Sequence, residues 1–270
     1  MVDRLVSKPN PFPKDRSGYG TVVGGEFVSP YPKDSPMRQF HLDAQAYFKD
    51  LAGAKDFPCL AGRSVARTDQ YAFCAYPSMT DQKFASGIMH DMIRFQGEFG
   101  IPDQPVANGH RFRSFVAAFQ EPTPQSPEDG AEKLYTLLGN LHDENKQHYA
   151  WSEGFSNDPQ SPNFGYSAGD SAFFLAFFHP KAYDVSRKSE ITFVVFNSHA
   201  MLDSLKEEGK FDRLRDAIRA RQDEVHPYLG NHGDVLEFRQ YALLEPTPMV
   251  EAQEIDLRER VLGKCPFQPK

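Results

Sequence analysis

Two histidines stand where two apolar segments of the chain end, and an imidazole at such a place can do chemistry. His179 directly follows the run Ala172–Phe178, and His199 comes three residues after the run Ile191–Phe196. A neutral imidazole can bind a metal through a ring nitrogen, but it can also simply hydrogen-bond to its surroundings. The residue types therefore leave two roles open for each histidine, that of a metal ligand and that of a structural group.

A third group with chemical potential is the thiol of Cys59, which follows Pro58 shortly before Gly62. Thiol catalysis and an inert buried cysteine are both compatible with this context. The other cysteines are Cys74 and Cys265, so the chain has an odd number without a CxxC spacing. This pattern predicts neither a disulfide framework nor a structural zinc site.

The elements that must position these groups can be read from hydrophobic periodicity. Both apolar runs are short and rich in Phe, Val and Ile, which is typical of buried strands. Further strands are expected at Tyr71–Tyr76, Phe112–Phe119 and Val235–Leu244. Helical spacing of apolar residues predicts helices over Phe40–Leu51, Met79–Phe99, Asp129–Gln147 and from His199 to about Arg221, with a break at Gly209. The arginines of the last helix are interpreted as a solvated face.

These elements do not alternate regularly as they would in a doubly wound parallel sheet. We therefore expect a single α+β domain with a mostly antiparallel sheet and packed helices. Residues 1–36 are rich in Pro, Gly, Ser and Lys without a sustained period, which predicts an irregular N-terminal arm. The domain proper is expected to span residues 37–270.

Composition excludes several function classes. The chain has 270 residues with a net charge of −7, which argues against a nucleic-acid partner. It shows no apolar run long enough for a bilayer and no signal-type segment, so no membrane partner and a cytoplasmic location are expected. The fingerprints GxGxxG, P-loop, GxSxG and HExxH are missing from the sequence.

The order of several segments resembles the YqcI/YcgG family, over residues from about 57 to 267. The matching pieces are Phe57-Pro58-Cys59, the region Asp69–Tyr76, HRFRSFVAAF, Trp151, NFGYSAGDSAFFLAFFHP, Ser186-Arg187-Lys188, FVVFNSH, Arg239-Gln240-Tyr241 and the final CPF. Some members of this family are heme-dependent N-hydroxylases that act on guanidine-bearing amino acids in guanitoxin and D-cycloserine biosynthesis. The resemblance implies an enzyme: a heme b monooxygenase that uses dioxygen or peroxide to hydroxylate a nitrogen of an arginine-like or other amino-containing molecule.

The resemblance also implies roles for single residues. The axial heme ligand is assigned to His179, whose His-Pro context matches the family motif, with His199 as the second choice. Cys59 is the third choice, because a thiolate would push electron density onto iron and favour O–O cleavage. The heme propionates would be held by Arg63, Arg187 and Lys188.

A guanidinium substrate would need a carboxylate partner, and Glu153 lies between Trp151 and Phe155, whose rings could flank a planar cation. No residue is assigned a catalytic role. The sequence contains no recognisable reductase module, so electrons would come from an external donor or from peroxide. It leaves open whether the protein forms a homodimer.

Three other functions remain open at this point. The protein could be a non-catalytic heme-binding protein, or a metal-free small-ligand-binding domain in which both histidines only satisfy backbone groups. It could also use another metal, since two strand-end histidines and a carboxylate would form a facial triad.

Overall fold

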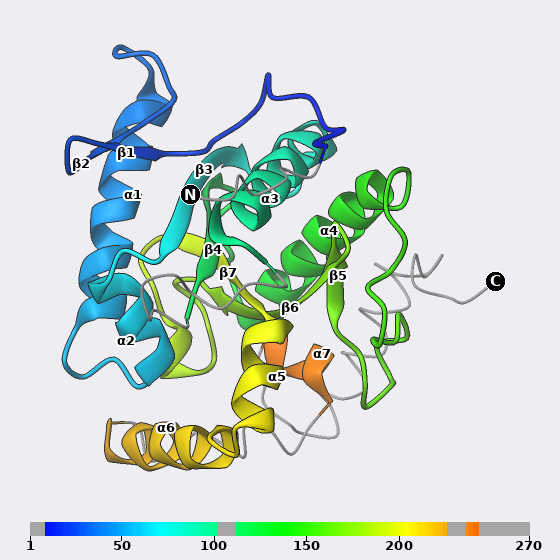
Figure 1. Cartoon of the computed structure of the whole chain (residues 1–270). Coiled ribbons are helices and arrows are strands. Elements are labelled where there is room, and N and C mark those ends of the chain that lie inside the picture. The colour runs from blue at the N-terminus through cyan, green and yellow to red at the C-terminus, as the bar shows by residue number, and fades with distance from the viewer. Residues whose placement is uncertain (1–8, 102–111, 226–235, 243–270) are drawn as a thin grey trace, which may run out of the picture.

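A mostly antiparallel sheet forms the centre of the protein (Figure 1). The computed structural model describes residues 9–101, 112–225 and 236–242. Within them the strand order is β3 (Tyr71–Ser78), β4 (Ser114–Glu121), β7 (Thr192–Ser198), β6 (Ser171–Phe178) and β5 (Tyr166–Ala168). The strands β3 and β4 pair in parallel, and the other neighbours are antiparallel. The expected α+β fold with a mostly antiparallel sheet is thus confirmed.

Helices cover both sides of this sheet. Side chains in a strand point alternately to the two sides, and in β6 Phe173, Leu175 and Phe177 lie in one apolar cluster whereas Ala176 and Phe178 lie in the other. The first cluster is closed by α3 (Ala85–Phe99), α4 (Pro127–Asn145) and α7 (Glu237–Ala242). The second is closed by α1 (Pro36–Gly53) and α2 (Leu60–Arg67).

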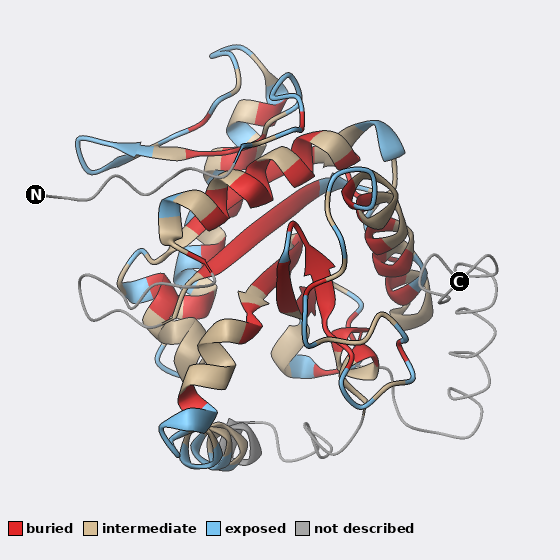
Figure 2. Cartoon of the chain, turned by 45° about the vertical axis from the view of Figure 1, so that its right-hand side comes forward, coloured by how far each residue is buried: buried red, intermediate tan, exposed pale blue. Residues whose placement is uncertain are grey.

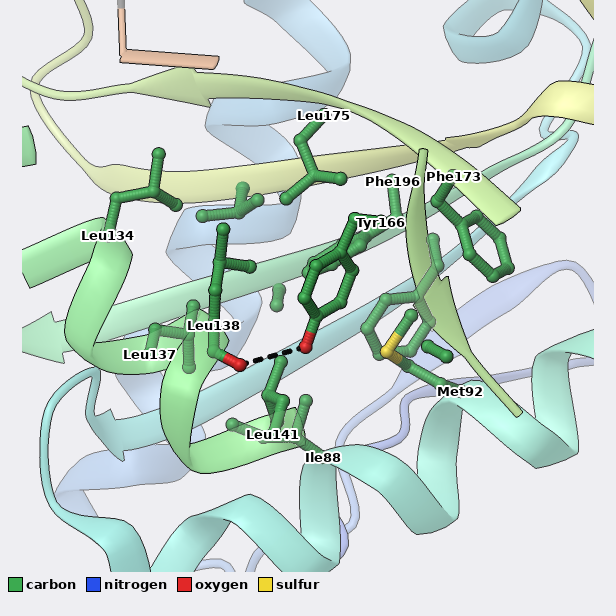
Figure 3. Close-up of a cluster of buried hydrophobic side chains, with 14 of the residues drawn as sticks. Ile88, Met92, Leu134, Leu137, Leu138, Leu141, Tyr166, Phe173, Leu175 and Phe196 are labelled. Atoms are coloured by element: carbon green, nitrogen blue, oxygen red, sulfur yellow. Dashed lines mark hydrogen bonds between the residues drawn. The ribbon is translucent and has the colours of Figure 1, made fainter. Parts of the chain in front are cut away.

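The core of the α3/α4 side is built from large apolar side chains of β5, β6 and β7 that face leucines of α4 (Figure 3). The Tyr166 hydroxyl reaches through this core and donates to the main-chain oxygen of Leu138 at 3.0 Å. A buried phenol normally needs such a partner, so this bond fixes β5 relative to α4.

Local sequence explains where the longer helices begin. The α4 helix starts with Pro127 behind Ser126, whose side chain accepts the amide of Asp129, a common N-cap arrangement. The α1 helix is capped in the same way by Ser35. The expected break at Gly209 is confirmed, because this residue has φ +64° between α5 (His199–Glu207) and α6 (Phe211–Val225).

One expected strand is wrong. The segment Val235–Leu244 contains the helix α7 rather than a strand, as far as the structure describes it. Phe238, Tyr241 and Ala242 are buried together, and their spacing of three and four residues places them on one side of a helix. The short elements α2 and β5 were not anticipated from the sequence.

Part of the N-terminal segment that is expected to be an irregular arm packs on the domain. Residues 9–20, here called the N-terminal strap, contact α3 where Asn10 and Phe12 each share a hydrogen bond with His90. The last three residues of the strap pair with the edge of β3, where Gly20 donates to Phe73 and Ala75 donates to Gly18 through main-chain bonds of 3.0 and 3.2 Å. The hairpin of β1 (Thr21–Val23) and β2 (Glu26–Val28) follows and projects from the body (Figure 2). Residues 1–8 lie outside the described part.

A buried carboxylate holds the strap. Asp91 of α3 is fully buried and accepts hydrogen bonds from the Ser17 hydroxyl at 2.5 Å, the Gly18 amide at 2.8 Å and the Tyr76 hydroxyl at 2.8 Å. Burial raises the pKa of Asp91 to about 6.

Among the described helices, none combines the length and apolar character that crossing a membrane requires.

Candidate functional site

The first-choice ligand, His179, lies deep in the α3/α4 side of the protein. It follows β6 directly and is 1% exposed, and its ring stacks on Phe177 with centroids 4.7 Å apart. Burial lowers the pKa of His179 to about 4, although Asp129 counteracts this. The ring is therefore neutral at physiological pH, as a metal ligand must be.

The space around this ring is nevertheless filled by α4. A Cβ atom on Gly130 would lie only 2.7 Å from Cε1 and 2.8 Å from Nε2 of His179. The helix backbone thus lies against the Cε1–Nε2 edge, and the buried Nδ1 has no hydrogen-bond partner among the described residues. Iron bound to Nε2 would need this edge open, so a heme does not fit at His179 unless α4 moves away.

The second choice, His199, begins α5 at the end of β7. Its Nε2 lies 2.9 Å from Oε1 of Glu237 in α7, and its ring lies 4.7 Å from that of Phe155. The Nδ1 atom is buried and lacks a hydrogen-bond partner within the described chain. Since Nε2 is the nitrogen that a heme would need, the Glu237 carboxylate occupies the binding position.

The carboxylate of Glu237 joins a buried polar network that the sequence reading missed. Its Oε1 also accepts a hydrogen bond of 2.6 Å from the Tyr241 hydroxyl, which in turn accepts the amide of Tyr166 at 3.3 Å. Glu237 and Tyr241 are four residues apart, a spacing that brings side chains together on a helix. Reading this segment as a strand concealed that signal.

The two histidines cannot share one metal ion. Strands β6 and β7 pair with Phe178 opposite Phe193 and Phe173 opposite Ser198. His179 therefore leaves the sheet at one end and His199 at the other, separated by at least five strand residues or about 17 Å. The facial-triad hypothesis is wrong, and no group of three or more His, Cys, Asp and Glu side chains in the described residues could hold a metal ion.

Cys59 lies on the opposite side of the sheet, at the start of α2. It is the N-cap of this helix, and its Sγ accepts the amide of Gly62 at 3.3 Å. The thiol is half-buried and belongs to a segment whose Phe57 stacks on Phe178 with centroids 6.3 Å apart.

Two of the three expected heme-binding cations lie on the same side of the sheet as this thiol. The Arg187 guanidinium lies 5.0 Å from the centre of the Phe178 ring and interacts electrostatically with Cys59 and Asp184. Burial lowers the pKa of Arg187. Arg63 stands one helical turn after Cys59, and its buried Nε has no hydrogen-bond partner among the described residues.

We call Cys59, Arg63 and Arg187, together with Phe57 and Phe178, the thiol–arginine cluster. It combines a sulfur ligand, two guanidinium groups and two aromatic rings that stack on each other. These are the residue types that a heme with its two propionates requires.

The remaining expected site residues lie outside this cluster. Lys188 is exposed, and its backbone pairs with that of His179. Glu153 is exposed in a turn before Gly154, which has φ +84°. Its neighbours Trp151 and Phe155 pack on the α4/α7 side and on His199, so Glu153 is not brought to Cys59.

Comparison with known proteins agrees with the segment order noted in the sequence. The model of the YqcI/YcgG family matches residues 48–268, which is most of the chain. No curated protein and no solved structure matches. The match includes the thiol–arginine cluster and both strand-end histidines, and on its extent the chain belongs to the YqcI/YcgG family.

Proposed function

We propose that the protein is a heme-dependent oxygenase that N-hydroxylates an arginine-like or other amino-containing small molecule, with heme b bound at the thiol–arginine cluster. The observation that carries this proposal is the position of Arg187, whose guanidinium lies over the Phe178 ring, while Phe178 stacks on Phe57 two residues before Cys59. A second support is membership of the YqcI/YcgG family, because the resemblance to that family implies heme chemistry. The cluster supplies a ligand, counter-charges and apolar walls in one place.

Each part of the cluster has a specific task in this proposal. The Sγ of Cys59 would be the axial ligand, and Arg63 and Arg187 would pair with the propionates. Phe57 and Phe178 would contact the macrocycle and keep water away from it. When bound, the heme would supply the activation of dioxygen or peroxide.

Two groups of the protein act on the sulfur of Cys59. The Gly62 amide donates a hydrogen bond to Sγ, and Arg187 interacts electrostatically with Cys59. In the proposal both groups would stay next to the sulfur when it holds the iron. Electrons would come from an external donor protein or from peroxide.

Absorption spectra of protein expressed with a heme precursor test the ligand assignment. We expect a Soret band in wild type that Cys59→Ser loses or shifts, whereas His179→Ala and His199→Ala keep it. Carbon monoxide added to the reduced protein should give the long-wavelength band of thiolate ligation. A band that persists in Cys59→Ser but disappears in either histidine variant would overturn the assignment.

Turnover separates the enzyme from a non-catalytic heme protein. The heme-loaded protein is incubated with L-arginine and either peroxide or a reductase system, and the N-hydroxylated product is measured by mass spectrometry. A heme-loaded protein that hydroxylates none of a panel of guanidines and amines would support non-catalytic heme binding. A protein that never takes up heme would support a metal-free ligand-binding domain.

A further inference from the structure

A third arginine reaches the neighbourhood of Cys59 from a distant part of the chain. Arg221 of α6 donates from Nε to the main-chain oxygen of Phe57 at 3.2 Å, and its Nη2 donates to the main-chain oxygen of Lys55. The α6 helix is thus bonded to the segment that leads into Cys59. The sequence reading had treated this arginine as part of a solvated face.

The positive charge of Arg221 acts on Arg63. The pKa of Arg63 is lowered, first by burial and then by the positive charges of Arg67 and Arg221. The opposing carboxylate is that of Asp56, which is exposed. This corner therefore brings three guanidinium groups together against one solvated acid.

The apolar core does not explain why Arg221 is held here. None of the side chains described in α6, from Phe211 to Arg221, is buried. The helix is joined to α5 through Gly209, whose left-handed backbone makes the connection turn sharply. Its hydrogen bonds to the Lys55 and Phe57 carbonyls hold its guanidinium at the segment that leads into α2, where its positive charge opposes that of Arg63. An anion between the two arginines would relieve this repulsion.

We propose that Arg63 and Arg221 together bind a carboxylate between α2 and α6. A guanidinium has five N–H donors, so Arg221 keeps donors beyond the two already used, and Arg63 contributes an Nε that has no partner. The carboxylate would satisfy these groups and neutralise their repulsion. It belongs either to a heme propionate or to the α-carboxyl group of an amino-acid substrate, and in this respect the inference rests on the proposed function.

Paired ligands that differ only in the carboxylate distinguish these two sources. Heme b is compared with its dimethyl ester, and L-arginine with agmatine, which lacks the carboxyl group. The variants are Arg63→Gln and Arg221→Gln, and Arg213→Gln is the control because Arg213 is exposed on the same helix.

If the site takes a propionate, both variants weaken heme b binding by about tenfold or more but leave the dimethyl ester unaffected. If it takes a substrate carboxylate, both weaken L-arginine binding to the same extent but leave agmatine unaffected. In either case Arg213→Gln should bind like wild type. Equal losses for both members of a pair, or no loss for any ligand, would overturn the inference.

A further experiment needs no heme, and it therefore tests this inference separately from the proposed function. Hydrogen exchange of α6 is followed in the full heme-free chain with L-arginine and with agmatine. If the site takes the substrate carboxylate, L-arginine alone should slow exchange in α6, and only when Arg63 and Arg221 are present. If heme is never bound and L-arginine does not slow exchange either, the carboxylate site is refuted along with the heme.

Discussion

The side chains of Phe178 and His179 are neighbours in sequence but lie on opposite sides of the sheet. Phe178 packs with Phe57 and Phe193 on the α1/α2 side, whereas the His179 ring lies against Gly130 of α4. The main chain of Arg187 accepts a hydrogen bond from the His179 amide, but its guanidinium lies over the Phe178 ring. This alternation moves the heme proposal from the His-Pro motif to the thiol of Cys59.

Replacing Gly130 by alanine should destabilise the protein by about 1–3 kcal/mol, because the new methyl group would overlap the His179 ring. In a His179→Ala background the same substitution should become neutral or stabilising, since alanine is the better helix former by up to about 1 kcal/mol. Urea unfolding of the four proteins gives the coupling energy.

Gly139 of the same helix provides the control, because no heavy atom would lie within 4 Å of its added Cβ. Gly139→Ala should therefore stabilise the protein by about 1 kcal/mol in both backgrounds. If Gly130→Ala is just as stabilising in the wild-type background, the close packing of His179 on α4 is refuted.

The carboxyl group of Asp91 should make the protein more stable as pH falls from about 6 to about 4. Its pKa is about 6 when folded and 3.8 when unfolded, so in this window the native state binds more protons. The contribution changes by at most about 1.4 kcal/mol per pH unit. Asp91→Asn removes it, so the variant should lose stability more steeply than wild type on acidification. Identical pH profiles in denaturant titrations would contradict this.

Two buried histidines should make the protein less stable as the pH falls, the opposite of the effect of Asp91. Burial lowers the pKa of both His41 and His179 to about 4 from an ordinary value of 6.5. Their contribution is complete above about pH 6.5 and is lost as pH falls toward 4, because the unfolded chain then takes up protons that the native state refuses. His41→Gln and His179→Gln should each flatten the acid side of the stability profile, and a slope that stays unchanged in both would refute this.

Removing the Glu237 carboxylate should cost about 1–3 kcal/mol, because His199 Nε2 and the Tyr241 hydroxyl would lose a buried partner. Glu237→Gln keeps an acceptor oxygen and should cost less than Glu237→Ala. The control Glu207→Ala, on an exposed part of α5, should change stability by no more than about 0.5 kcal/mol. If Glu237→Ala and Glu207→Ala change the free energy of unfolding in urea equally, the network around Glu237 contributes nothing to stability.

The regular part of the fold could be predicted because its residues repeat with a clear period. The run Ala172–Phe178 is continuously apolar and forms β6, and the spacing of Leu134, Leu138 and Leu141 places them on one side of α4. The prediction of a strand around Phe238 was wrong because a short apolar run suits both a strand and a helix. Only the partners available in the folded chain decide between them.

The site was less predictable than the fold. Sequence reasoning identified Cys59, Arg63 and Arg187, but it could not tell that the Arg187 guanidinium lies over Phe178 while Lys188 is exposed. The position of these two side chains depends on the side of the sheet along which the chain runs after β6. Arg221 carries no local signal, because its hydrogen bonds go to main-chain oxygens more than 160 residues earlier.

The pairing of the N-terminal strap with β3 has a consequence for how copies of the protein meet. In the described sheet β3 is the outermost strand on its side, and the strap covers its edge at Phe73–Ala75, where amide and carbonyl groups would otherwise be free. Such an edge is a template on which another chain can add a strand. The strap therefore protects this edge strand from pairing with another copy of the protein. A shortened chain that begins after Gly20 would expose the edge of β3, and its molecules could polymerise through it.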